Sequence, residues 1–412
     1  MANDLRNSQI LSNTFLARLK NTLAFTMSVN REWSKEWRGT GANKGVTINI
    51  RKPPILSGGR GEVAEPEAIQ DQLVPLTLNT RYHQAVKLSS QELSLNLTDY
   101  GEQVMQPAVD VICNMIDSDG LALAYKTVPH YVGVQGVNPT TNQVYIDAGS
   151  RLSDNAVPTG SSRFVVLNPT MQGGILNTQA TQFNNQGDIS DQNRNGSMGK
   201  AWGFKFGMDQ NVARHTAGAL GTTPLVNVSG GVTEGSTSVV VDGASASVTG
   251  YWKEGDIVTF ASSRGVNPSS KVAWDRLRPF AVAADASSDG SGNVTLYLTE
   301  AIRATGPYQN VTALPADNDA ILTFGHASTY AGVGGAQGLA YHKDFITFAT
   351  CDLYLPPAGI VDGSRASSND LNLSIRHIRY YEGGPDRVVD RYDVLGGWKV
   401  LRPEMACRIL GS

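Results

Sequence analysis

Residues 46–88 read VTINIRKPPILSGGRGEVAEPEAIQDQLVPLTLNTRYHQAVKL, and this stretch decides how the rest of the chain is interpreted. Near its start, Ile48 and Ile50 alternate with polar residues until Pro53 and Pro54 end the pattern, which predicts a half-buried strand. A matching strand follows a long tip, and its apolar face is formed by Leu76, Leu78, Tyr82, Val86 and Leu88. A two-stranded ribbon without a second layer is not stable in isolation. We therefore expect something outside the ribbon to cover its apolar face.

Two helices are predicted on either side of this ribbon in the sequence. Residues 8–27 place apolar side chains four apart, which predicts an amphipathic helix whose apolar stripe packs on another subunit. The stripe is formed by Leu11, Phe15, Leu19 and Leu23. A longer helix is predicted from Asp99 to Tyr125, because Asp99 and Glu102 fit a capping box, and we expect Pro107 to kink or restart it. Its apolar face is formed by Val109, Ile112, Ile116 and Leu123.

The second half of the chain is dominated by β patterns. RFVVLN at 163–168 predicts a buried strand. Between residues 223 and 330, short strand patterns alternate with turn residues, which predicts a small antiparallel barrel or sandwich inserted into a larger domain. These patterns are SVVVDG, GDIVTF, RPFAVAA, NVTLYLT and AILTF. We interpret GVGGAQG at 332–338 as a flexible hinge, and we interpret EGGPD at 382–386 and GG at 396–397 as turns between the last strands.

The composition excludes several classes of protein. Charged residues make up 17% of the 412 residues, below the roughly 25% of an average soluble protein. The formal net charge is −3 and no segment concentrates Lys and Arg, which argues against tight binding to nucleic acid. No apolar run approaches the length of a membrane span, and the N-terminus lacks the pattern of a signal peptide, so we expect a cytoplasmic protein. The scattered cysteines are expected to be buried reduced thiols: Cys113, Cys351 and Cys407.

No motif in the sequence predicts a chemical site. GVGGAQG departs from the dinucleotide pattern at Gln337, and DQNRNGSMGKAW lacks a calcium-binding Glu because its last residue is Trp202. The histidines lack metal-ligand spacing, and His342 with Asp344 is interpreted as a pair of polar caps. The alternating charges of DRVVDRYD at 386–393 suit ion pairing between subunits or within the strands. We expect no catalytic residue, no cofactor and no metal site.

The order of these parts resembles a known family. The segments that carry the resemblance are SVNREW, VTINIRKPP, GEQVMQPAVDVICNMIDSD, RFVVLNP, GKAWGFKFGMDQNVARHTAG, GDIVTFASSRGVNPSS, GLAYHKDFITFATCDLYLP and RYDVLGGWKVLRPEMACRI. Together they resemble the major capsid (coat) proteins of tailed double-stranded DNA bacteriophages. The resemblance is to the branch with an inserted β-barrel domain and a separate scaffolding protein.

The resemblance implies an α+β fold of the tailed-phage major capsid type. It assigns residues 1–45 to an N-terminal arm, 46–88 to an extended loop and 89–127 to a spine helix. The peripheral and axial domains take residues 128–222 as their first part and 331–412 as their second part, and the inserted β-barrel domain between them takes 223–330. In this family the extended loop lies across the adjacent subunit, so that a neighbour covers its apolar face.

The implied function is structural. We expect copies of the chain to form the hexamers and pentamers of an icosahedral head, with a scaffolding protein during assembly and a portal protein at one vertex. The head would be assembled in the host cytoplasm and would loosely enclose double-stranded DNA, without sequence-specific binding and without a membrane. The residues expected at subunit interfaces are Phe15, Leu19, Arg51, Arg60, Glu62, Glu65, Glu67, Asp71 and Arg81. Two alternatives stay open at this point: a hydrolase with a β-rich accessory domain, and a phage tail or adhesin protein.

Overall fold

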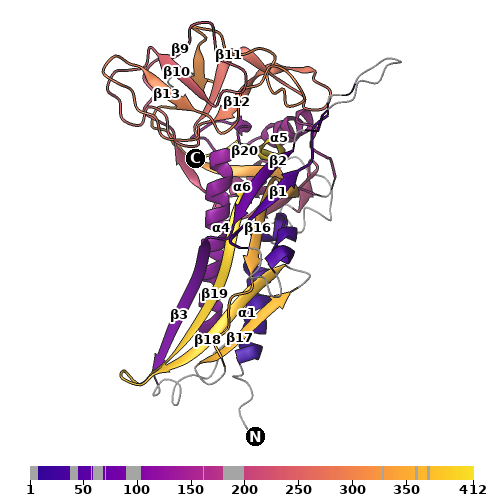
Figure 1. The fold of residues 1–412 in the computed structure, drawn as a ribbon, viewed down its shortest axis with the longest axis vertical. Helices are drawn as coiled ribbons and strands as arrows, with labels where there is room; N and C mark the ends of the chain where they lie inside the picture. The colour runs from indigo at the N-terminus through magenta and orange to yellow at the C-terminus, as the bar shows by residue number, and fades with distance from the viewer. Residues whose placement is uncertain are drawn as a thin grey trace. The chain divides into compact units, whose positions relative to one another are not determined.

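A computed structural model describes residues 8–37, 45–56, 58, 68–69, 71–89, 104–160, 162–179, 199–326, 329–357, 361–368 and 372–412. The chain divides into two compact units (Figure 1). Unit 1 comprises Met1–Ile50, Leu73–Leu121 and Ile346–Leu401. Unit 2 comprises Arg51–Gln72, Ala122–Phe345 and Arg402–Ser412.

Unit 1 is built on a five-stranded antiparallel sheet. Its strands are β3 (Thr80–Ser89), β16 (Ile346–Cys351), β17 (Asp362–Ser368), β18 (Leu373–Glu382) and β19 (Arg387–Val400). β19 is the longest of them and pairs with β3, β16 and β18, while β17 pairs with β18. EGGPD forms the turn between β18 and β19, as predicted. The helical segments of this unit are α1 (Ser8–Thr22), α2 (Phe25–Ser28), η2 (Glu32–Trp37) and the first part of α4 (Gln106–Thr127).

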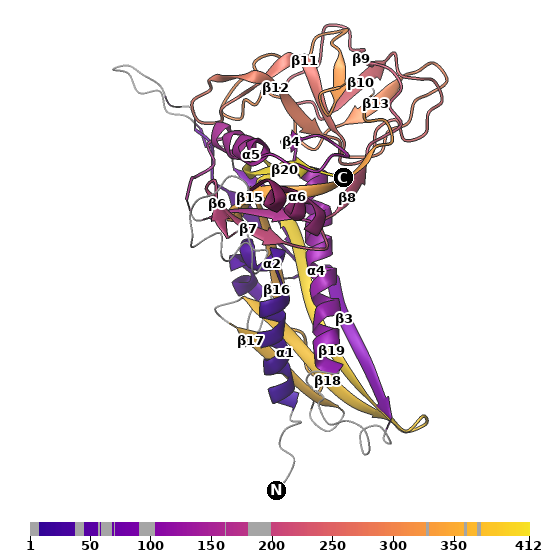
Figure 2. The same cartoon turned by 180° about the vertical axis from the view of Figure 1, so that it is seen from behind.

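The first helix packs within its own chain, which corrects the expectation of a partner subunit. α1 lies against β17 and β18 in both views of the ribbon (Figures 1 and 2). The ring of Phe15 stacks on Tyr392 of β19 with the ring centroids 4.3 Å apart, and Leu19 is 1% exposed. Because the chain itself removes this stripe from water, Phe15 and Leu19 offer no apolar surface to a second subunit.

The long helix keeps the predicted face. Val109, Ile112 and Ile116 are fully buried. Pro107 lies in the first turn of α4, where backbone N–H groups make no hydrogen bond within the helix. Its lack of an N–H therefore costs no hydrogen bond, and the regular helix begins at Gln106 without a kink at Pro107. The predicted capping box at Asp99 lies outside the described residues.

The predicted ribbon is only partly correct. β1 (Thr47–Lys52) pairs with β2 (Gln72–Thr77) in a separate two-stranded sheet, whereas β3 pairs with β19 from Thr80 to Ser89. The two patterns therefore do not form one long hairpin. The apolar face near the base of the ribbon is covered by its own unit, in a cluster formed by Trp37, Ile50, Leu76, Leu78, Ala349 and Leu401.

The pair GG at 396–397 is also not a turn, because β19 continues through it to Val400. A Cβ atom on Gly397 would lie 2.1 Å from the backbone oxygen of Thr77, and one on Gly396 would lie 2.8 Å from the ring of Phe348. Glycine in a strand interior commonly marks the close approach of another segment. These residues let the β2–β3 corner and the Phe348 ring approach the strand.

Unit 2 is built on a seven-stranded mixed sheet. Its strands are β4 (Tyr131–Gly133), β5 (Arg163–Leu167), β6 (Lys200–Ala201), β7 (Phe204–Met208), β8 (Arg214–Thr216), β15 (Gly334–His342) and β20 (Ala406–Leu410). The other elements around it are α5 (Gln143–Asp154), α6 (Pro169–Gln179), η5 (Lys343–Phe345) and η6 (Pro403–Met405). The predicted strand at 163–168 is β5.

The proposed hinge at 332–338 lies mostly within β15, which pairs with β5, β8 and β20. All but the first residue of this strand are buried. A Cβ atom on Gly335 would lie 2.2 Å from the backbone oxygen of Gly411. The hinge interpretation is therefore wrong, and the glycines serve close packing in the sheet.

The inserted segment forms all five of the predicted strands. They are β10 (Ser238–Asp242), β11 (Ile257–Val266), β12 (Ala273–Ala281), β13 (Val294–Tyr297) and β14 (Ile321–Thr323), with β9 (Leu225–Val226) in addition. They make two three-stranded sheets, β13-β10-β9 and β12-β11-β14, on one shared apolar core (Figure 2). Isolated bridges such as Val282 to Leu298 link the sheets. A second bridge, Leu225 to Ala320, joins the other edges of the two sheets, so this pairing fits the expected small barrel or sandwich.

Candidate functional site

The strands β1 and β2 and the loop between them carry a surface ion pair and exposed apolar residues. Arg51 Nη2 lies 3.0 Å from Asp71 Oδ2 and both side chains are largely exposed, so two residues predicted at an interface already pair within one chain. Leu56 and Ile69 of the loop are 53% and 65% exposed, and Leu73 of β2 is 57% exposed. Exposed large apolar side chains of this kind are candidates for burial by a partner.

One face of the sheet in unit 1 is strongly basic. Alternate residues of a strand share a face, and residues opposite each other on paired strands also share it. The registers of β3, β17, β18 and β19 place two acidic residues on one face, Asp393 and Glu382, and Glu382 pairs with Arg387. They place a larger basic set on the same face: Arg81, His83, Lys87, Arg365, Arg376, Arg387 and Arg391. We call these residues the basic face. The basic face was not predicted from the sequence, because its members come from strands far apart in the chain. The alternating positions of Arg81, His83 and Lys87 were the one sign of it within a single segment.

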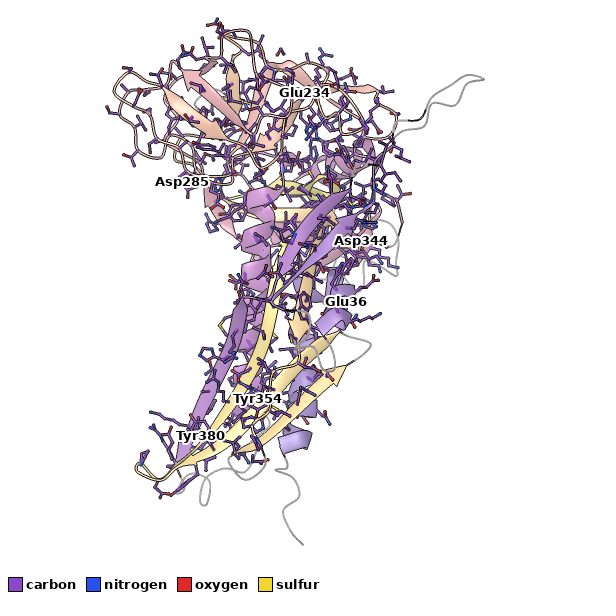
Figure 3. The ribbon with its side chains drawn as sticks, in the orientation of Figure 1. Glu36, Glu234, Asp285, Asp344, Tyr354 and Tyr380 are labelled. Atoms are coloured by element: carbon purple, nitrogen blue, oxygen red, sulfur yellow. The ribbon has the colours of Figure 1, made fainter. Side chains whose placement is uncertain are left out.

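A buried carboxylate holds part of the basic face in place. Asp393 is fully buried and accepts hydrogen bonds from Arg376 Nε at 3.2 Å and Arg391 Nε at 2.8 Å. Arg376 also donates to the backbone oxygen of Tyr354 at 2.7 Å. Tyr354 is 73% exposed and is marked with Tyr380 of β18 in Figure 3. Asp393 fixes the geometry of both guanidinium groups and offsets part of their charge.

A second buried carboxylate lies on the opposite face. Asp390 accepts hydrogen bonds from Arg379 Nε at 2.6 Å and Arg379 Nη2 at 2.7 Å, and its Oδ1 lies 3.1 Å from His377 Nε2. The charges of DRVVDRYD thus pair mainly across the β18–β19 hairpin, which neither expected arrangement included. Arg391 pairs with Asp393 within β19, as one of the two expectations had it. The partners Arg376 and Arg379 come from the neighbouring strand.

The remaining predicted interface residues divide into two groups. Arg81 is exposed on the basic face. Arg60, Glu62, Glu65 and Glu67 lie outside the described residues.

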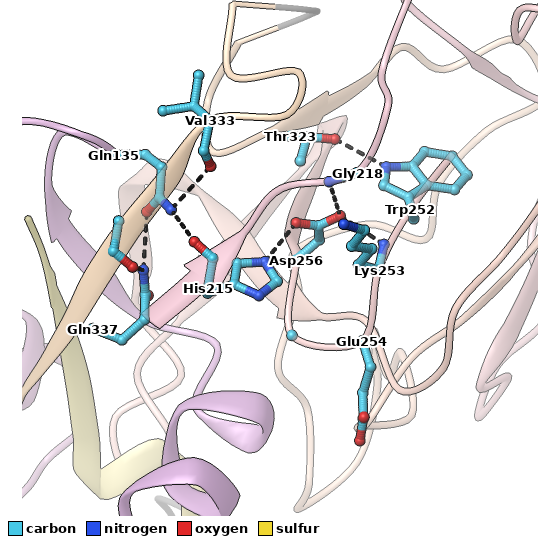
Figure 4. Close-up of polar contacts among 12 residues, drawn as sticks. Gln135, His215, Gly218, Trp252, Lys253, Glu254, Asp256, Thr323, Val333 and Gln337 are labelled. Carbon is cyan, nitrogen blue, oxygen red and sulfur yellow. Dashed lines mark hydrogen bonds and ion pairs between the residues drawn. The ribbon is translucent and has the colours of Figure 1, made fainter. Parts of the chain in front are cut away.

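Buried polar groups fix the inserted sandwich within unit 2 (Figure 4). Asp256, which is fully buried, accepts from the backbone N–H groups of Gly218 at 3.1 Å and Lys253 at 2.8 Å, and lies 2.8 Å from His215 Nε2. Arg408 of β20 donates to the backbone oxygen of Gly255 at 2.7 Å. Burial lowers the pKa of Arg408 to about 9, against the opposing effect of Asp256. These contacts join the inserted segment to β8 and β20.

His342 and Asp344 form a local pair at the end of β15. His342 Nδ1 lies 3.5 Å from Asp344 Oδ2, and the Asp344 side chain is 38% exposed. Burial lowers the pKa of His342, and Asp344 opposes this effect. The pair fits the polar-cap interpretation.

Among the described residues, no group of three or more His, Cys, Asp or Glu side chains could hold a metal ion. None of the helices within the described ranges is long and apolar enough to cross a membrane. Cys113, Cys351 and Cys407 are free thiols, and Cys113 and Cys407 are buried.

Comparison with known sequences settles the family. The profile of the P22 coat protein family, described as P22 coat protein, gene protein 5, matches residues 63–411. The chain belongs to the P22 coat protein family. The resemblance to tailed-phage coat proteins is thereby confirmed, and with it the capsid class of fold.

A relative and two solved structures accompany this family match. The major capsid protein of Acyrthosiphon pisum secondary endosymbiont phage 1 is 26% identical over 183 residues, which are 42% of this chain and 41% of that protein. The match thus spans about two fifths of the relative's length. A structure from Mycobacterium phage Che8 is 12% identical, with a TM-score of 0.46 over 94% of this chain and 90% of its own. The capsid of Ralstonia phage GP4 is 9% identical, with a TM-score of 0.44 over 100% of this chain and 93% of its own.

Proposed function

We propose that the chain is the structural major capsid protein of a tailed phage and has no catalytic role. Copies of it assemble into the hexamers and pentamers of an icosahedral head that encloses double-stranded DNA. The family match over residues 63–411 is the observation that carries this proposal. The exposed apolar residues Leu56, Ile69 and Leu73 support it, because a neighbouring copy would remove them from water.

The proposal includes the partners that a head of this kind needs. A separate scaffolding protein directs assembly in the host cytoplasm, and a portal protein occupies one vertex. The enclosed DNA is held loosely, which the formal net charge of −3 supports, because few phosphates would be neutralised by the shell as a whole.

For the contact between copies, we propose that the acidic tip docks on the basic face of a neighbour. The tip carries Glu62, Glu65, Glu67 and Asp71. The basic face offers Arg81 and Lys87 as exposed cations on β3. Charge complementarity of this type fixes the register of two subunits more than it adds affinity. Head-to-tail contacts between identical chains close into rings when the rotation allows it.

Negative-stain electron microscopy of the purified chain tests assembly. Shells or ring-shaped capsomers are expected, and a chain that stays monomeric at high concentration with scaffolding protein present would refute the capsid proposal. The docking contact is tested separately by reversing Glu65 and Glu67 to Lys, which should prevent assembly. A second reversal of Arg81 and Lys87 to Glu should restore it.

A matched control reverses charge elsewhere on the surface. Glu32 and Asp275 are exposed, and changing both to Lys alters the net charge by the same amount. This control should assemble normally. If the Glu65 and Glu67 reversal also assembles normally, the docking contact is wrong while the capsid function stands.

A further inference from the structure

Unit 2 contains a cavity of about 300 Å³ between the inserted sandwich and the elements that carry it. It is lined by residues of α5, β4, β11, β12 and β14. Its apolar wall is formed by Tyr131, Val132, Leu277, Pro279 and Leu322. Its volume is at the lower end of the range for small-molecule sites, roughly 300–1,000 Å³.

A buried histidine in the wall has a hydrogen-bond donor without an acceptor. His130 is 1% exposed, and its Nε2 lies 3.0 Å from Asn155 Nδ2 and 3.2 Å from Arg278 Nη1. Both neighbours are donors, so Nε2 must be the unprotonated acceptor and the neutral ring carries its proton on Nδ1. Nδ1 is buried and has no hydrogen-bond partner among the described residues. Such a group normally has a ligand or a water as its partner.

Two arginines bring positive charge to the same cavity. Arg151 of α5 makes no side-chain hydrogen bond or ion pair with any residue that the structure describes. Arg276 of β12 stacks over the ring of Trp274 at 4.6 Å, and its Nη2 lies 2.6 Å from Asp154 Oδ2. Burial is the largest cause that lowers the pKa of His130, and the charges of the nearby arginines add to it. Because Asp154 pairs with Arg276, Arg151 is the arginine of this wall whose charge no carboxylate contacts among the described residues.

Two carboxylates oppose the charge of these arginines: Asp154, which pairs with Arg276, and Asp147, which is part of the wall. Asp147 lies one helical turn before Arg151 and accepts a hydrogen bond from Gln143 Nε2 at 2.8 Å. No ion pair joins Asp147 to Arg151 among the described residues, so the arginine is not neutralised by direct contact. The carboxylate should weaken the binding of an anion without preventing it.

We propose that this cavity binds a phosphate oxyanion, free or as a small monoester. The guanidinium group of Arg151 pairs with its oxygens, and Arg276 joins it while keeping its contact with Asp154. His130 Nδ1, which is buried, donates to the ligand after a small shift of the ring. Planar guanidinium groups match the geometry of phosphate. The apolar wall would accept the organic part of an ester. This inference concerns a ligand site within unit 2 and does not depend on the proposed assembly.

Isothermal titration of the purified, unassembled full chain with inorganic phosphate tests the site, with chloride used to hold the ionic strength constant. Saturable binding is expected. Arg151→Gln should weaken it at least about tenfold, which corresponds to the loss of a charged hydrogen bond. Asp147→Asn should tighten it several-fold, because a like charge is removed while the hydrogen bond from Gln143 is preserved. Arg264→Gln is the matched control, since Arg264 is an exposed arginine of β11 that does not line the cavity, and it should bind like the wild type.

Phenyl phosphate distinguishes the two sources of the oxyanion. Tighter binding than inorganic phosphate identifies an ester, and equal or weaker binding identifies free phosphate. The proposal is overturned if Arg151→Gln and the wild type bind equally, or if the heat does not saturate and follows ionic strength, which would indicate an adventitious ion only. If circular dichroism shows that Arg151→Gln fails to fold, Arg151→Lys replaces it, and unchanged affinity in that variant also overturns the proposal.

Discussion

Replacement of Gly397 by Ala is the sharpest test of the packing in unit 1. Gly397 lies inside β19, where a Cβ atom would meet the backbone of another segment at 2.1 Å from Thr77 O, 3.0 Å from Thr77 C and 3.1 Å from Leu78 Cα. None of these atoms belongs to a flexible side chain. The β2–β3 corner would have to move as a whole.

The size of the effect follows from these distances. Cβ atoms do not approach other heavy atoms closer than 3.0 Å, so Thr77 and Leu78 must shift by about 1 Å. The shift would disturb Leu76 and Leu78, which are 0% and 5% exposed in the cluster around Trp37. Inserting a methyl group into a well-packed site usually costs about 1–3 kcal/mol. Because backbone rather than a side chain must yield, we expect a loss of about 3 kcal/mol.

Urea unfolding of the full chain, followed by tryptophan fluorescence, measures this loss. The matched control is Gly384→Ala in the β18–β19 turn, where an added Cβ meets no atom within 4 Å and φ is not in the left-handed region. The free energy of unfolding of this control should lie within about 0.5 kcal/mol of the wild-type value. Equal stability of the two variants would refute the packing argument and would favour the sequence interpretation of GG as a turn.

Two further predictions concern buried polar groups. Asp390→Ala should lower the free energy of unfolding by about 3 kcal/mol, because it leaves the Arg379 guanidinium without its carboxylate. An Arg379→Met, Asp390→Leu double variant should recover most of that loss, as measured by urea unfolding. If the double variant is as unstable as the single one, the unpaired charge is not the cause. Burial raises the pKa of the Cys407 thiol to about 12, so the thiolate stays scarce at pH 8 and the thiol should react with a disulfide reagent only after unfolding. Rapid reaction of Cys407 in the native chain, located by peptide mapping, would contradict the burial.

Local sequence patterns were sufficient to predict most of the helices and strands. The five predicted strands of the insertion, the buried strand at 163–168 and the apolar face of α4 all follow from periodicity over a few residues. Such patterns are readable because burial on one face selects apolar residues at the period of the element. The order of the segments then indicated the family, which the family match confirms.

Local patterns did not predict which distant segments pair with each other. The run from Leu76 to Leu88 has one continuous alternation, yet Leu76 lies in β2 and residues from Thr80 onward pair with β19. Alternation reports which face is buried and carries no information about which strand supplies the hydrogen bonds. The same limit produced the error at Gly396 and Gly397.

The sequence by itself determined that this chain belongs among the tailed-phage coat proteins, and where its strands and the apolar face of its long helix lie. Only the tertiary structure decided that α1 packs on its own sheet, that scattered arginines gather on one face, and that a cavity forms beside His130. The physical reason is that periodicity is a local property of the chain, whereas the partner of a buried side chain or of a charge is chosen by residues hundreds of positions away.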